Sequence, residues 1–367
     1  MTNDIMTSYE ALPPIPPPLQ NISRRSLLKA AGLAGATALS LSGCAALGTQ
    51  RENAVVFVSD GGEYQAAQRK AWLTPFQQQN PDLRLVEDVP KNYAKLKAMV
   101  ASGNVQWDLM TATGDFGYGT DRTFLQDWAG LGLPTSQLLP EYVHDSVVGH
   151  TIFSNVIAYR TDRIKGPGPQ SWADFFDLDK FPGKRALRNL SNGAVLEIAL
   201  IADGVAPEDL YPIDFKRAFA KLDSIRKQTI FWTTGAQSAQ LLADGEVSMA
   251  QVWNGRVYNL QKTGAPIAIQ WNQHFIQADT LVIPRGANVE YAAKLAKYML
   301  SAENNAKLSQ YIPYGPTNQE SLALVDKKMK EHLPTSHLDI GINPNNEWLN
   351  ANRADVSSRW QKWVTSA

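Results

Sequence analysis

The sequence contains a single cysteine, Cys44, among its 367 residues, so it can form no internal disulfide and no cysteine-rich metal site. It also lacks a charge excess, because 35 Lys and Arg residues balance 35 Asp and Glu residues. The basic residues are scattered, which argues against a nucleic-acid partner. No apolar run reaches about 18 residues, so no membrane-spanning helix is predicted. With 44% hydrophobic and 19% charged residues, the composition is that of a globular protein, and the length predicts more than one domain.

The motifs of common enzyme classes are missing as well. The sequence has no G-x-S-x-G, no H-E-x-x-H, no phosphate-binding G-x-x-x-x-G-K and no G-x-G-x-x-G after a predicted strand. None of its five histidines has another at i+3 or i+4, so we expect no metal site. We therefore predict a protein without cofactor that is not an enzyme. Catalytic groups can be scattered along a chain, so a secreted enzyme remains an alternative.

The first 53 residues have the order of an export signal followed by an anchor. A proline-rich stretch precedes Arg24-Arg25, an apolar run covers residues 30–41, and small residues lead to Cys44. Twin arginines before a short apolar run are typical of twin-arginine export, and residues 41–44 resemble the bacterial lipobox. We predict a signal peptide at 1–43, lipid on Cys44 and a tether at 44–53. These features indicate a periplasmic location with attachment to a membrane face.

The remaining chain alternates between strand and helix patterns. Short apolar runs predict strands at 55–58, 83–86, 107–112, 184–190, 247–252 and 281–283, and helical spacing predicts helices at 64–79, 93–102, 194–202, 215–226, 237–243 and 291–311. Gly103 is the expected C-cap of the second helix. This alternation predicts an α/β protein with two units, each built on parallel strands flanked by helices.

Glycine-bearing loops follow four of these strands, at 60–62, 113–115, 191–193 and 253–255. Ligands of open parallel sheets bind beyond the carboxyl ends of the strands. We therefore expect the four loops to face one cleft between the two units.

Several motifs carry a resemblance to a known family. They are residues 93–97 (YAKLK), 107–109 (WDL), 171–174 (SWAD) with 181–184 (FPGK), 252–255 (VWNG), 279–284 (DTLVIP) and 314–318 (YGPTN). In this order they resemble periplasmic solute-binding proteins of ABC importers, in the branch that binds spermidine and putrescine. The resemblance covers about residues 55–322. It implies a two-lobed type II periplasmic-binding-protein fold with an interdomain ligand cleft, divided into 54–157 with 279–317 and 158–278 with 318–367.

The resemblance also implies a pocket and partners. Tyr64, Trp253, Asp279 and Tyr314 match the aromatic residues and the carboxylate that hold an amine in the family. The implied partners are an amine-bearing small molecule and an ABC permease that recognises the closed form, and we expect a monomer. Alternatively, the protein serves a chemoreceptor instead of a permease. Another alternative is that its ligand is iron, bound by tyrosines such as Tyr64 and Tyr118.

The sequence departs from the family at the far end of the pocket. Tryptophans of the family are replaced near Gly61 and at Gln277, Asp115 stands in place of an aromatic residue, and an acidic pair has become Ser191-Asn192. Arg188 lies close by, and Thr113 opens the second glycine-bearing loop. Negative charge is thus lost at one end. Because a buried unpaired ammonium is costly, we expect a compact amino compound, such as an amino acid, rather than spermidine.

Overall fold

The computed structural model describes residues 53–366. The predicted signal peptide, Cys44 and nearly all of the tether lie outside the described residues. Within them the chain forms nine strands: β1 (Ala54–Val58), β2 (Arg84–Asp88), β3 (Leu109–Thr113), β4 (Val148–Arg160), β5 (Arg185–Arg188), β6 (Thr229–Trp232), β7 (Met249–Trp253), β8 (Ile267–Val282) and β9 (Gly315–Pro316).

The α-helices are distributed over the whole described chain. They are α1 (Gly62–Gln68), α2 (Thr74–Gln79), α3 (Tyr93–Ser102), α4 (Trp172–Phe176), α5 (Val195–Ala202), α6 (Phe215–Ile225), α7 (Gly235–Ala243), α8 (Asn254–Lys262), α9 (Val289–Leu300), α10 (Ala302–Lys307), α11 (Ser321–Leu324), α12 (Lys327–Lys330) and α13 (Asn346–Thr365). In the described part of the chain, no helix combines the length and the apolar character needed to span a bilayer.

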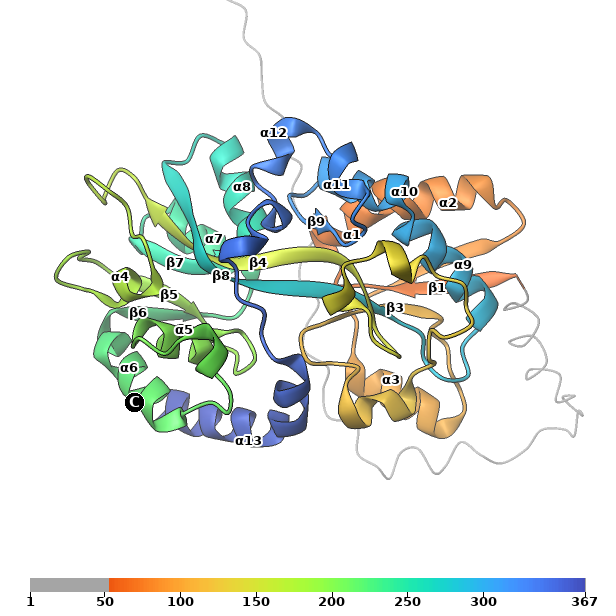
Figure 1. Ribbon diagram of the computed structural model, residues 1–367, viewed down its shortest axis with the longest axis horizontal. Helices are drawn as coiled ribbons and strands as arrows, with labels where there is room; N and C mark the ends of the chain where they lie inside the picture. The colour runs from red at the N-terminus through yellow and green to blue at the C-terminus, as the bar shows by residue number, and fades with distance from the viewer. Residues whose placement is uncertain (1–52, 367) are drawn as a thin grey trace, which may run out of the picture. The chain divides into compact units, whose positions relative to one another are not determined.

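The strands form one sheet in the order β2-β1-β3-β8-β4-β7-β5-β6, with β9 beside β4. Its two ends are parallel: β1 pairs with β2 and β3, and β5 pairs with β6 and β7. The long strands β4 and β8 pair antiparallel with each other and with their outer neighbours, and they run through the middle of the molecule (Figure 1). We call the β2-β1-β3 end with its helices the first lobe and the β7-β5-β6 end with its helices the second lobe. The predicted α/β architecture with parallel strand groups is confirmed.

Each lobe has an apolar core on both faces of its strands, as parallel sheets require. In the first lobe, Val55 and Phe57 pack with Trp72 and Leu295, whereas Val58 packs with a second cluster on the opposite face. The second lobe has the same arrangement, with one cluster around α5 and α6 and another around α7 and β7. The two cores hold the strand ends that form the cleft in place.

Local signals explain which elements match their predictions. Helix α3 covers the predicted 93–102: the Asn92 side chain accepts a hydrogen bond from the Lys95 backbone N–H at 2.9 Å, and Gly103 closes the helix at φ 69°. The prediction of one helix over 291–311 is wrong, because Ser301 adopts an extended conformation and separates α9 from α10. The prediction of a loop at 253–255 is also wrong, since Trp253 ends β7 and α8 begins at Asn254.

The last helix, α13, contacts both lobes. Its C-terminal half buries Val356, Trp360 and Trp363 in the core of the second lobe. Its N-terminal half reaches the first lobe, where Arg353 binds Asp115. Before α13 in the chain, residues 322–333 pack against α10 on the first lobe. The predicted lobe boundaries stay a prediction.

Candidate functional site

A cavity of about 440 Å³ lies between the lobes. Residues from all four predicted loops line it. Nine of the sequence-predicted site residues lie on its wall: Gly61, Tyr64, Thr113, Arg188, Asn192, Trp253, Gln277, Asp279 and Tyr314. Asp115 and Ser191 do not line it. Asp115 lies buried behind the wall and accepts a hydrogen bond from the Asn192 side chain at 3.0 Å. The geometry thus brings most predicted residues together, and their binding roles stay predictions.

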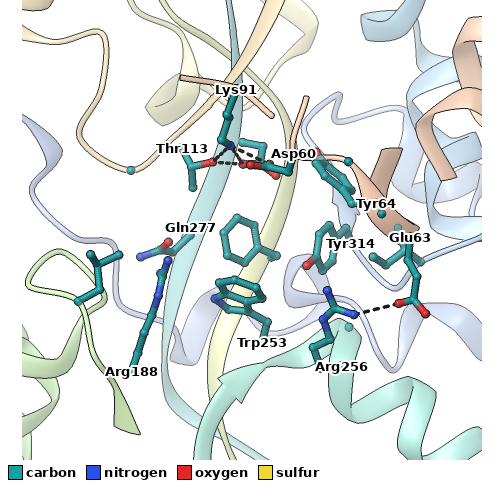
Figure 2. A pocket seen from close by; sticks show the side chains of 18 of the residues that line it. Asp60, Glu63, Tyr64, Lys91, Thr113, Arg188, Trp253, Arg256, Gln277 and Tyr314 are labelled. Atoms are coloured by element: carbon teal, nitrogen blue, oxygen red, sulfur yellow. Dashed lines mark hydrogen bonds and ion pairs between the residues drawn. The ribbon is translucent and has the colours of Figure 1, made fainter. Parts of the chain in front are cut away.

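The first lobe supplies an ionic cluster at one end of the cavity (Figure 2). The Lys91 ammonium lies 2.6 Å from Thr113 Oγ1, 2.8 Å from Asp60 Oδ2 and 3.8 Å from Asp279 Oδ1. Thr113 and Asp279 are paired residues of β3 and β8, which explains why the Thr113 hydroxyl donates to the Asp279 carboxylate. Burial raises the pKa of Asp60, against the opposing effect of Lys91. Two carboxylates and one ammonium leave this end with one net negative charge.

Aromatic side chains form the middle of the wall. The Phe153 ring stacks on Tyr314 with ring centroids 5.3 Å apart, and its edge meets Trp253 at 6.1 Å. Tyr64 lies 5.6 Å from Tyr314 and bonds through its hydroxyl to Nε2 of His150 at 3.1 Å. Burial raises the pKa of both tyrosines, so the wall is neutral. Such a surface suits an alkyl chain, and its ring faces also attract an ammonium group.

The second lobe supplies an arginine at the other end. Strand β5 ends at Arg188, whose guanidinium lies 5.0 Å from the Trp253 ring and 5.7 Å from the Trp232 ring. Among the described residues this guanidinium has no carboxylate or hydrogen-bond partner. Burial lowers the pKa of Arg188 to about 10, which leaves it charged at neutral pH. Its planar guanidinium lines the cavity and is available to a ligand. Guanidinium groups bind carboxylates with two parallel hydrogen bonds.

Contacts between the lobes close the cavity on two sides. At one side Glu63 of α1 accepts from Arg256 at 3.0 Å and from Asn259 at 3.3 Å, both on α8. At the other side Asp115 accepts from Arg353 at 2.5 Å and from Asn192. Figure 2 shows the Glu63–Arg256 pair separated from Arg188 and Gln277 by Trp253. The structure is thus a closed arrangement of the two lobes.

Sequence reasoning missed several residues of the cavity wall: Glu63, Lys91, Tyr93, Phe153, Leu190, Arg256, Asn259 and Ile312. Lys91 follows β2, so the strand-end rule that located the other loops applies to it as well. Tyr118, considered for iron, does not line the cavity. Across the described residues, no group of three or more His, Cys, Asp or Glu side chains could hold a metal ion.

Residues 71–335 match the family described as bacterial extracellular solute-binding proteins. The chain belongs to this family. The gamma-aminobutyric acid-binding protein of Pseudomonas aeruginosa is 36% identical to this solute-binding protein over 315 residues, which cover 82% of this chain and 88% of that protein. The solved structure of the Atu4243-GABA receptor superposes with a TM-score of 0.81 at 36% identity and covers 86% of this chain and 98% of that one. The two-lobed type II periplasmic-binding-protein fold is thereby confirmed.

The spermidine/putrescine-binding periplasmic protein 1 of Haemophilus influenzae is 31% identical over 195 residues, which cover 52% of this chain and 53% of that protein. The family resemblance is therefore established, whereas the polyamine branch is not. The family consists of solute-binding proteins, which is consistent with a chain that is not an enzyme. Its members act outside the cytoplasm, which supports the extracytoplasmic part of the predicted location. The predicted export signal and lipid anchor lie in residues that the structure does not describe.

Proposed function

We propose that this ABC-transporter solute-binding protein captures a short amino acid whose amine and carboxylate lie at opposite ends of an alkyl chain, such as γ-aminobutyrate. One observation carries the proposal: among the described residues that line the cavity, three carboxylates and three cations leave one charge of each sign without a partner. Glu63 is paired with Arg256, and Lys91 compensates one of the carboxylates of Asp60 and Asp279. One negative charge and Arg188 remain.

The spacing of the two ends supports a short ligand. Gln277 and Asp279 are alternate residues of β8 and share one face of the strand, so their Cα atoms are about 7 Å apart. Gln277 lies on the side of the cavity where Arg188 lies (Figure 2). A compact zwitterion bridges such a distance, with its amine at Asp279, its methylenes on the aromatic wall and its carboxylate at Arg188.

A long polyamine fits this charge distribution less well. Each of its ammonium groups needs a negative partner, because burying an unpaired charge costs several kcal/mol. At the Arg188 end it would meet a cation instead. The relatives support the same choice, since the two most extensive matches above are named for γ-aminobutyrate.

Isothermal titration tests the proposal. γ-Aminobutyrate and 5-aminovalerate should bind at least about tenfold more tightly than putrescine or spermidine. The neutral amide of γ-aminobutyrate is the matched control and should bind weakly, because it removes only the carboxylate charge. Tighter binding of spermidine than of every short amino acid would contradict the proposal.

We propose that capture proceeds by closure of the two lobes and that an ABC permease accepts the closed, loaded form. Ligand contacts from both lobes stabilise that form. We also propose that residues 1–43 direct twin-arginine export and that lipid on Cys44 anchors the protein. A Cys44→Ser variant should then leave the membrane fraction, and a variant that still sediments with membranes would contradict the anchor.

A further inference from the structure

Lys91 is the least expected charge in the cavity. It lies in the loop after β2, where its backbone N–H donates to the Ser59 carbonyl at 2.9 Å and holds the loop against the end of β1. Its side chain is only 12% exposed. The ammonium therefore has a fixed position inside the first-lobe end of the cleft.

The Lys91 ammonium is surrounded by acceptor groups of the first lobe. Its three donors face the Asp60 carboxylate, the Thr113 hydroxyl and, at 3.8 Å, the Asp279 carboxylate. Burial disfavours its charged form, but Tyr93 and the two carboxylates outweigh this effect and raise the pKa of Lys91 above its ordinary value. Lys91 thus stays charged and occupies part of the space and the charge that a ligand ammonium would use.

The charge balance without this lysine would be different. Asp60 and Asp279 would then present two negative charges to the cavity, which is what two ammonium groups require. With Lys91 present, one of those charges is already compensated. A second ligand ammonium would be buried without a partner, at a cost of several kcal/mol.

We propose that Lys91 is a specificity-determining residue, an internal counter-cation that limits the first-lobe end of the cleft to a single ligand ammonium and so excludes diamines and polyamines. This inference rests on the proposed function, because it assigns the amine of the ligand to that end. It deepens the proposal by naming the residue that separates amino acids from diamines.

The test compares γ-aminobutyrate with putrescine by isothermal titration in the full-length protein, in wild type and in Lys91→Met. Methionine is an unbranched side chain only one atom shorter than lysine, and it removes the charge. The preference for γ-aminobutyrate over putrescine should fall by at least about tenfold in Lys91→Met, mainly because putrescine binds more tightly. A preference that changes by less than about twofold would overturn the proposal.

Two further variants keep the result interpretable. Lys91→Gln retains hydrogen bonding without charge and replaces Lys91→Met if thermal unfolding shows that the methionine variant does not fold. Lys95→Met is the matched control, because Lys95 lies on α3, is 50% exposed and pairs with Asp88 away from the cavity; its ligand preference should equal that of wild type.

The two proposals fail in different ways. If wild-type protein does not bind γ-aminobutyrate, the proposed function is wrong. The Lys91 proposal is then decided by putrescine alone, which must bind Lys91→Met at least about tenfold more tightly than wild type. If wild type binds γ-aminobutyrate and the preference is unchanged in the variants, only the role of Lys91 is wrong.

Discussion

Arg188 is the single residue on which the carboxylate end of the proposed site depends. Replacing it with glutamine removes the charge and keeps a shorter polar side chain that can still donate a hydrogen bond. Because a truncated charge pair in a desolvated cleft typically costs about 2–5 kcal/mol, we expect Arg188→Gln to weaken γ-aminobutyrate binding by at least about thirtyfold. Isothermal titration at neutral pH measures the change.

The amide of γ-aminobutyrate provides the control for this variant. It has no carboxylate, so its affinity should differ little between wild type and Arg188→Gln. Binding of γ-aminobutyrate within about threefold of wild type would show that Arg188 does not bind the carboxylate.

Single residues of the site were predictable where they stand in a motif or directly after a predicted strand. Trp253, Asp279 and Tyr314 belong to motifs, and Arg188 precedes a glycine-bearing loop. Lys91 follows a predicted strand but stands in no motif and in no glycine-bearing loop, and Arg256 lies inside helix α8. Their places in the cavity depend on how α8 packs and on the β1–β2 register, in which Val58 pairs with Asp88, and no local sequence pattern specifies such long-range pairing.

Helix α13 joins the lobes by an ionic contact whose strength can be measured. Arg353 donates to Asp115 at 2.5 Å and to Asp121 at 2.9 Å, and its side chain is 38% exposed. We expect Arg353→Ala to weaken ligand binding about three- to tenfold, because a partly exposed ion pair contributes on the order of 1 kcal/mol to the closed form. Titration measures the affinity, and small-angle X-ray scattering of the loaded protein should show a larger radius of gyration.

Arg359 on the same helix is the matched control for Arg353. It pairs with Asp355 within the helix and is 51% exposed. Arg359→Ala should leave the affinity unchanged. Equal effects of the two substitutions would mean that α13 acts through its own stability and not through its contact with the first lobe.

Elements differed in how far the sequence specifies them. Helix α3 has an Asn cap, a helical apolar spacing and a closing glycine, so its bounds were predictable. Strand β8 spans 16 residues, and the predicted strand at 281–283 overlaps only its last two. Its first part, from Ile267 to Gln277, interrupts its apolar residues with the polar stretch 272–274, and Gln273 breaks its regularity at φ 60°. Crossing strands of this kind lack the continuous apolar run of a core strand.

The whole molecule should lose stability in mild acid because two buried histidines are neutral in the folded state. Burial lowers the pKa of His150 to about 3 and that of His274 to about 4, whereas both titrate near about 6.5 when unfolded. Between these values the unfolded chain binds more protons than the folded one. The free energy of unfolding should therefore decrease as the pH falls through this window, with a slope approaching about 2–3 kcal/mol per pH unit near about pH 5.

Urea unfolding at several pH values between about 5 and about 6.5 measures this slope. His274→Gln should reduce it by about the contribution of one proton. His274 is a suitable position because it lies outside the cavity, bonded to Ser154 at 2.7 Å and to the His337 carbonyl at 2.8 Å. A slope that does not change in the variant would show that His274 does not titrate between the two states.

Closure of the cleft should depend on salt concentration because of two ion pairs, Glu63–Arg256 and Asp115–Arg353. Both join the lobes, and three of the four side chains are about a third or more exposed, so dissolved ions reach them. The screening length shrinks from about 30 Å at 0.01 M salt to about 8 Å at 0.15 M. Members of this family act outside the cytoplasm, where the salt concentration varies. The closed form should thus hold its solute longest at low ionic strength and release it more readily in concentrated salt.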